Sequence, residues 1–324
     1  MSRILNLIEG YMDGDAWEDL CVRCYRMKYQ EHHYVSIPAV HKGDAGVEGY
    51  TKTGIVHQCY CPERAYSDDA LYEHQRDKLS ADVKKMLENA SRLRALGISI
   101  IHEWHFNIPE YKDSRILAHA TAKQMEVLSE KLNDPSAYSH IADDFRIIIK
   151  IAEDLAPEIS KILRTTITNN RLNFAIQHVS PPDWSQCDST KVENIRRKIK
   201  AVMHKAVMHI DNDSDPALNR VIELYVDFYI SGMENMASLR INFPEIYEDL
   251  YKLEQSFKNE VSIKTLMNTD HSMNQSVFTS ILTEFGEKLE KEFSTIFNQA
   301  SIGEIKQDLI ASWLADCSME FRSR

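Results

Sequence analysis

The chain has 324 residues, of which 43% are hydrophobic and 27% charged, and its formal net charge is −11. Ten glycines and nine prolines are too few for a collagen-like, low-complexity or loop-rich all-β protein. No stretch approaches the roughly 18 to 20 apolar residues of a membrane helix, and the first residues do not have the pattern of a secretory signal. We therefore expect a mostly helical, cytoplasmic globular protein with one or two domains and no membrane partner.

The charges are distributed unevenly along the chain. Residues 161–210 contain nine Lys and Arg against three Asp and Glu, whereas residues 211–324 contain ten against twenty. The basic segment either contacts phosphate groups or an acidic surface, or it forms a solvated helix face. The basic side chains that we consider for phosphate contact are Arg196, Arg197, Lys198 and Lys200.

The first half of the chain mixes predicted helices and strands. Asp15 is the predicted N-cap of a helix over residues 16–29, with Glu18 completing a capping-box-like pair. Extended segments follow at 32–40 and 54–61, separated by a segment with four glycines. The remaining predicted elements are a helix at 67–96, a strand within 97–110, a helix at 114–132 and a strand at 144–151. This order predicts a mixed α+β domain spanning residues 1–155.

The second half, residues 156–324, is predicted to be an all-α helical bundle of roughly five helices. Helices are expected at 156–169, from Thr190 to His209, after Asp215-Pro216, after Pro244 and over 304–321. Between the last two, apolar residues recur at every fourth position and indicate the bundle core. This stripe consists of Val277, Ile281, Phe285, Leu289, Phe293 and Phe297.

Six cysteines raise the question of a zinc site. The pairs Cys21-x-x-Cys24 and Cys59-x-Cys61 offer four thiols, enough to close a tetrahedral shell. However, Cys21 and Cys24 fall in one apolar helical stripe with Trp17, Leu20 and Met27, without the turn residues of a zinc ribbon. We therefore predict buried, reduced thiols and a protein without stoichiometric zinc.

The Gly-rich segment HKGDAGVEGYTKTG (residues 41–54) carries the most chemical information. It places Asp44 and Glu48 at a strand boundary and leads into a strand that bears Gln58, while Glu18 on the preceding helix can face the same point. Carboxylate and amide oxygens are ligands that Mg²⁺ prefers, and Mg²⁺ or Mn²⁺ held in this way activates water for attack on a phosphodiester. The alternative is a solvated hairpin whose glycines only form turns.

Three segments of the first half together resemble the Mrr-type restriction endonuclease branch of the PD-(D/E)xK nucleases. They are WEDLCVRCYRMKY, GDAGVEGYTKTG and IVHQCYC. That branch has a helix, a GD-x-G-(I/V)-(D/E)-G segment and a strand ending in (E/Q)-x-K. The resemblance covers residues 15–65 and implies a restriction-endonuclease-like fold. It also implies that Glu48 and Asp44 bind metal, that Gln58 is the half-motif amide, and that Glu18 is the helix carboxylate found in some members.

The chain departs from this family at Tyr60, where the pattern has lysine. That lysine positions the attacking water and offsets charge in the transition state, for which a phenol is a poor substitute. Either the lysine has moved to the following helix, where Lys78 is the candidate, or the site is degenerate and the domain binds without cutting.

The resemblance implies that the chain is a metal-dependent DNA endonuclease with a role in bacterial antiphage defence. Its catalytic residues would be Glu48, Gln58 and Lys78. The alternative is an inactive nuclease-fold subunit that scaffolds a defence complex or binds DNA with a partner ATPase. In both cases the helical domain is expected to contact another chain, either a different subunit or a second copy in a homo-oligomer.

Overall fold

The computed structural model describes residues 2–10, 12–37, 45–165, 171–174, 184, 187–203, 215–316 and 318–321. They belong to two compact units, residues 1–6 with 10–162 and residues 7–9 with 163–324. The division therefore lies at 162/163 rather than at the predicted 155/156. Helix α5 (Ala156–Leu163) falls largely in the first unit, where the Glu158 carboxylate lies 3.9 Å from the Lys28 ammonium.

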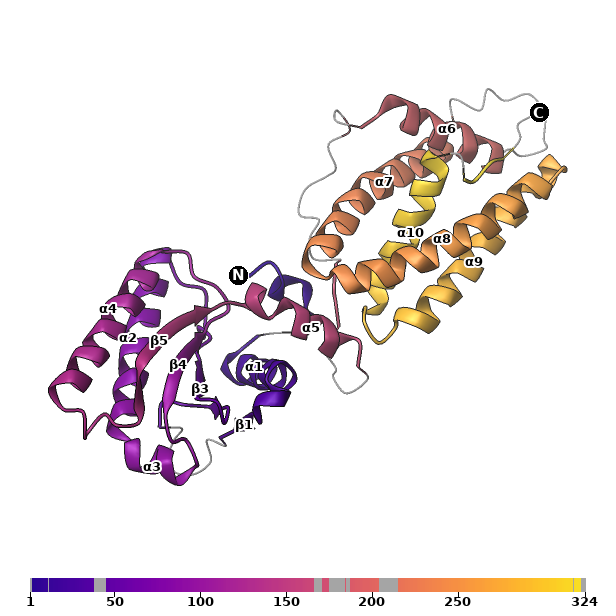
Figure 1. Ribbon diagram of the computed structural model, residues 1–324. Helices are drawn as coiled ribbons and strands as arrows, with labels where there is room; N and C mark the ends of the chain where they lie inside the picture. The colour runs from indigo at the N-terminus through magenta and orange to yellow at the C-terminus, as the bar shows by residue number, and fades with distance from the viewer. Residues whose placement is uncertain are drawn as a thin grey trace. The chain divides into compact units, whose positions relative to one another are not determined.

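The first unit is a mixed α+β structure built on a five-stranded sheet with strand order β1-β2-β3-β4-β5 (Figure 1). Strands β1 to β3 pair antiparallel, whereas β3, β4 and β5 run parallel. His57 in β3 is opposite Gly49 on one side and His105 on the other. The strands are β1 (Val35–Ser36), β2 (Gly49–Tyr50), β3 (Ile55–Cys59), β4 (Ile101–Asn107) and β5 (Ile141–Lys150).

Helices cover both faces of this sheet, with α2 and α4 on one face and α1 on the other (Figure 1). The N-cap of α1 is Asp13, whose carboxylate accepts from the Ala16 amide, and not the predicted Asp15. The predicted helix at 67–96 is divided at Asn89 into two helices. The helices are α1 (Gly14–Lys28), α2 (Asp68–Glu88), α3 (Ala90–Ala95) and α4 (Arg115–Asn133), with 3-10 turns at Leu5–Leu7, Gln30–His32 and Ala152–Leu155.

Two glycines of the Gly-rich segment are required by close packing. Gly46 has φ +76°, and a Cβ there would lie 2.2 Å from the Asp82 carbonyl oxygen of α2. At Gly49 a Cβ would lie 2.3 Å from the Tyr34 hydroxyl. The Gly46 carbonyl also accepts a hydrogen bond from the buried Trp104 indole, at 3.1 Å. Residues 46–49 are therefore fixed against α2 and the sheet, which determines the position of Glu48 between these glycines.

The described part of the second unit is helical. As predicted, Asp215 caps α7 by accepting from the Ala217 amide, and Pro216 and Pro244 open α7 and α8. The last helix begins earlier than predicted, because Asn298 caps it by accepting from the Ser301 amide. The helices are α6 (Ser189–Met203), α7 (Pro216–Asn242), α8 (Pro244–Met267), α9 (Asn274–Phe293) and α10 (Gln299–Ala315), with a 3-10 turn at His271–Met273.

Aromatic side chains form the core of this second unit. The ring centroid of Phe285 lies 5.0 Å from that of Phe257 and 4.7 Å from that of Trp313. The predicted apolar stripe is buried except for Val277, which is half-buried. The stripe is therefore bundle core, as predicted. Across the described ranges, each helix is either too short or too polar to cross a bilayer.

Candidate functional site

An open cavity of about 440 Å³ lies where the start of α1, the end of β3 and the middle of α2 come together. Glu18, Glu48 and Lys78, which the sequence predicts as site residues, all line it, as does Tyr60. The other lining residues are Asp13, Gly14, Asp15, Cys59, Cys61 and Glu63. The fold thus brings side chains from α1, the Gly-rich segment, the end of β3 and α2 to one space.

Glu48 is held in place by both its backbone and its side chain. Its amide donates to the His57 carbonyl at 2.8 Å, which ties the residue to β3. The Gln58 Nε2 donates to Glu48 Oε1 at 2.7 Å, and both residues are buried. Because an ionised carboxylate only accepts hydrogen bonds, the amide nitrogen of Gln58 must face it. Gln58 therefore positions the carboxylate of Glu48.

Lys78 reaches the cavity from α2 and is anchored by a buried carboxylate. Its Nζ lies 2.8 Å from Asp82 Oδ2, while Lys85 Nζ lies 3.0 Å from Asp82 Oδ1. The side chain of Asp82 is fully buried, and that of Lys78 is 31% exposed. An ion pair with a buried partner limits the positions that the ammonium can take. Lys78 is thus a positioned cation at the cavity that contains Glu48.

Tyr60 occupies the position where the nuclease pattern has lysine. Its ring is stacked with that of Phe106, with centroids 6.4 Å apart. Burial raises the pKa of Tyr60 to about 12. The phenol therefore stays protonated at neutral pH, so that it can donate a hydrogen bond but supplies no positive charge.

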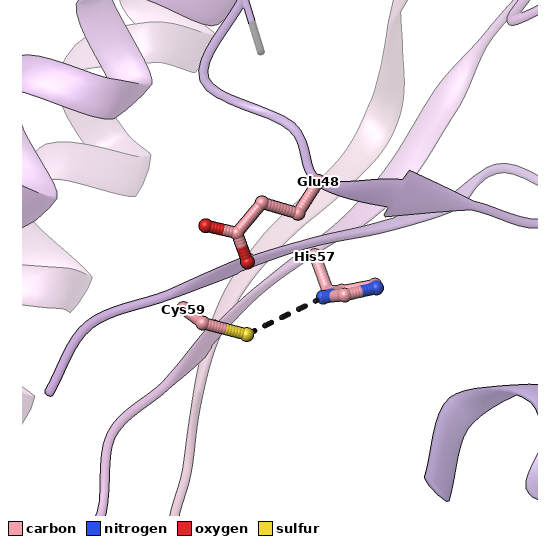
Figure 2. Close-up of side chains that lie close together, drawn as sticks. All are labelled: Glu48, His57 and Cys59. Carbon is pink, nitrogen blue, oxygen red and sulfur yellow. Dashed lines mark hydrogen bonds between the residues drawn. The ribbon is translucent and has the colours of Figure 1, made fainter. Parts of the chain in front are cut away.

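A cluster of buried donor atoms lies beside Glu48 on the face of β3 opposite Gln58. Figure 2 shows the carboxylate of Glu48 directed towards the side chains of His57 and Cys59. One ligand atom from each of these three residues lies within 4.8 Å of the other two. The Cys59 thiol is 3.8 Å from His57 Nδ1, and the nearby Cys21 thiol contributes to its raised pKa. We refer to Glu48, His57 and Cys59 as the donor cluster.

Burial keeps the imidazole of His57 and the thiol of Cys59 uncharged in the absence of a cation. It lowers the pKa of His57 to about 3 and raises that of the Cys59 thiol well above its ordinary value. Sequence reasoning missed His57 and did not connect Cys59 with Glu48. The available signal was the alternation in β3, which places His57 and Cys59 on the same face.

The cysteines of α1 are buried, as predicted. Cys21 and Cys24 have no exposed surface, and the five described cysteines are free thiols. Met27, which the sequence placed in the same apolar stripe, is instead 38% exposed. Burial raises the pKa of both α1 thiols, as expected for inert core cysteines.

Of the other predicted site residues that the structure describes, neither Gln58 nor the basic residues of α6 line the cavity. Asp44 lies outside the described residues. In α6, the side chain of Lys198 is fully buried and donates to the Asp316 carbonyl, and Arg197 pairs with Glu320 at 3.1 Å. Arg196 is exposed and Lys200 half-buried. The predicted basic stretch is therefore not one continuous solvent-facing surface, and Lys198 is part of the bundle interior.

No protein-family model, no curated protein and no solved structure matches this chain. What the chain does is therefore inferred from the chemistry of its own residues.

Proposed function

We propose that the first unit is a divalent-cation-dependent phosphodiesterase that cleaves DNA at the cavity lined by Glu18, Glu48 and Lys78. The observation that carries this proposal is the convergence of two carboxylates and a positioned ammonium from α1, the Gly-rich segment and α2 on one open space. The element order of helix, Gly-rich segment and strand, which the resemblance to Mrr-type nucleases requires, also supports it.

The charge of the cavity supports a requirement for a cation. Its lining contains five carboxylates against a single lysine. A nucleic acid phosphate would be repelled by this surplus of negative charge unless cations offset it. Glu48 and Glu18 would hold Mg²⁺ or Mn²⁺, because hard cations prefer carboxylate oxygens. Bound there, such a cation supplies Lewis-acid stabilisation of the phosphate and a more acidic water.

The remaining side chains have distinct roles in this proposal. Gln58 keeps the Glu48 carboxylate oriented through its 2.7 Å hydrogen bond. Lys78, fixed by Asp82, supplies the positive charge that offsets negative charge developing on the phosphate, and it orients the attacking water. Tyr60 borders the same cavity as a neutral hydrogen-bond donor.

The second unit is proposed to be a surface for another protein chain, either a partner such as an ATPase or a second copy. Exposed apolar side chains on α8 support this role. Ile263, Leu266 and Met267 near its C-terminal end are 58%, 55% and 75% exposed. A part in antiphage defence is proposed from the resemblance to Mrr-type nucleases alone.

The proposal is tested by incubating the full chain with supercoiled and linear DNA in Mg²⁺, Mn²⁺ or EDTA. Glu48→Ala is expected to lower the cleavage rate by at least about 100-fold while the circular dichroism spectrum is unchanged. Glu63→Ala is the matched control, because it removes an exposed carboxylate from the same cavity, and its rate should stay within about threefold of wild type.

Two outcomes would contradict the proposal. Undiminished cleavage by a folded Glu48→Ala variant would remove this site from consideration. DNA binding by the wild-type chain without cleavage in either cation would replace the proposal with the non-catalytic alternative.

A further inference from the structure

The donor cluster combines three different ligand atoms in one buried place (Figure 2). A carboxylate oxygen of Glu48, an imidazole nitrogen of His57 and the sulfur of Cys59 lie within 4.8 Å of one another. Contrary to the expectation from the sequence of no stoichiometric zinc, we propose that these three residues bind a borderline-soft divalent ion of the Zn²⁺ type. The site is distinct from the all-oxygen Mg²⁺ site at the cavity, although the two share Glu48.

The identity of the donors selects the class of metal. Thiolate and imidazole ligands favour Zn²⁺ and related transition-metal ions, whereas Mg²⁺ and Ca²⁺ take oxygen ligands. One thiolate, one carboxylate and one neutral imidazole carry a total charge of −2, which a divalent ion cancels. A neutral assembly is what a fully buried site requires, because burying net charge is costly. All three side chains are at most 6% exposed.

Two of the three ligands have the outer hydrogen bonds that metal ligands usually have. His57 Nε2 lies 2.7 Å from the Tyr34 hydroxyl, and Glu48 Oε1 accepts from Gln58 Nε2 at 2.7 Å. If Nε2 donates to Tyr34, the lone pair of His57 is on Nδ1, the nitrogen that lies 3.8 Å from the Cys59 sulfur. Such partners orient a ligand and fix its tautomer.

The cluster also has an entry path. Glu48 and Cys59 line the open cavity, so the cluster borders a space that is open to solvent. The fourth ligand of a tetrahedral shell would be a water from the cavity.

This inference rests on the donor geometry and not on the proposed nuclease activity. The two proposals fail separately, because Lys78 lies outside the donor cluster and His57 and Cys59 have no assigned role in phosphodiester cleavage. Metal binding without nuclease activity would support the cluster alone, whereas Mg²⁺-dependent cleavage by a chain that binds no Co²⁺ would support the nuclease alone.

The test is titration of the metal-stripped full chain with Co²⁺, which replaces Zn²⁺ and reports a cobalt–thiolate bond as an intense near-ultraviolet absorption band. We expect one Co²⁺ per chain and displacement of the band by one equivalent of Zn²⁺. Cys59→Ser should abolish the band. The matched control, Cys24→Ser, removes a buried thiol of α1 outside the cluster and should keep it.

A second, conservative variant tests the same site in case Cys59→Ser does not fold. Tyr34→Phe removes only the hydroxyl beside His57 Nε2, and we expect it to weaken Co²⁺ binding by about 10- to 100-fold. The inference is overturned if wild type binds no stoichiometric Co²⁺, if Cys59→Ser retains the band, or if Tyr34→Phe binds Co²⁺ as tightly as wild type.

Discussion

The two units bury polar side chains for different purposes. In the second unit, the buried polar groups that we can trace satisfy backbone groups or one another: Asn298 caps α10, Asn274 donates to the Ala201 carbonyl, and Asn235 donates to Asp308. In the first unit, buried Glu48 and His57 come together beside an open cavity.

This difference distinguishes buried polar groups that only stabilise the fold from buried polar groups that can take part in chemistry. A buried polar group costs free energy unless it is hydrogen-bonded, so isolated satisfied groups such as Asn274 need no explanation beyond the fold. A cluster of a carboxylate, an imidazole and a thiol is harder to account for, because an apolar core would be as stable. We therefore expect substitutions in the aromatic core of the second unit to lower stability. Substitutions in the donor cluster and the cavity of the first unit should instead change metal binding and catalysis.

The largest stability effect is expected for Phe285→Ala in the bundle core. Phe285 is fully buried between Phe257 and Trp313, so its truncation should lower the free energy of unfolding by about 3 to 5 kcal/mol. Hydrogen exchange of peptides from α8 and α9 in urea measures this loss. Tyr251→Ala, at a 47% exposed position of α8, is the control and should cost less than about 1 kcal/mol. Equal losses in the two variants would contradict the assignment of the core.

A smaller but still large effect is expected where the Gly-rich segment packs on α2. Gly46→Ala would place a methyl group 2.2 Å from the Asp82 carbonyl oxygen at a φ of +76°, and should destabilise the first unit by about 2 kcal/mol or more. Gly303→Ala in α10 meets nothing within 4 Å and should be neutral or slightly stabilising. Thermal unfolding compares the two, and an unchanged melting temperature for Gly46→Ala would show that the segment is not fixed as described.

The smallest effect concerns the pH dependence of the bundle. Burial raises the pKa of Asp308 to about 7, so between about pH 4 and 7 the folded chain holds a proton that the unfolded chain releases. The stability due to Asp308 is therefore complete near pH 4 and is lost as the pH rises to 7. Between pH 4 and 7, the free energy of unfolding should fall by about 1 to 3 kcal/mol more in wild type than in Asp308→Asn. Parallel stability profiles of wild type and variant would contradict the raised pKa.

Much of the fold was predictable from local sequence signals. The predicted succession of helices and strands in the first half matches the structure except at two places: the helix breaks at Asn89, and the short strand β2 in the Gly-rich segment was not predicted. The stripe from Ile281 to Phe297 is buried as its period indicates. The exact caps were less predictable, because Asp13 and Asp15 are equally good N-caps by sequence and only the chain geometry selects Asp13.

The site was predictable only in part. Glu48 and Gln58 follow from a local motif, and they lie together. The proximity of Lys78 to Glu48 depends on how α2 packs on the sheet, which no local pattern specifies. Strand alternation places His57 and Cys59 on one face, but the Tyr34 hydroxyl that His57 meets there comes from another part of the chain. Lys198 shows the reverse error, since its basic neighbours suggested a surface and the bundle buries it.

The role of Lys78 as the displaced lysine is the central claim, and a rescue experiment tests it most directly. Lys78 and Tyr60 line the same cavity, so a lysine introduced at position 60 can reach the same substrate. We predict that Lys78→Ala lowers the rate of Mg²⁺-dependent DNA cleavage by about 100-fold and that adding Tyr60→Lys recovers at least about tenfold of that loss. Cleavage by Lys78→Ala at the wild-type rate would contradict the account.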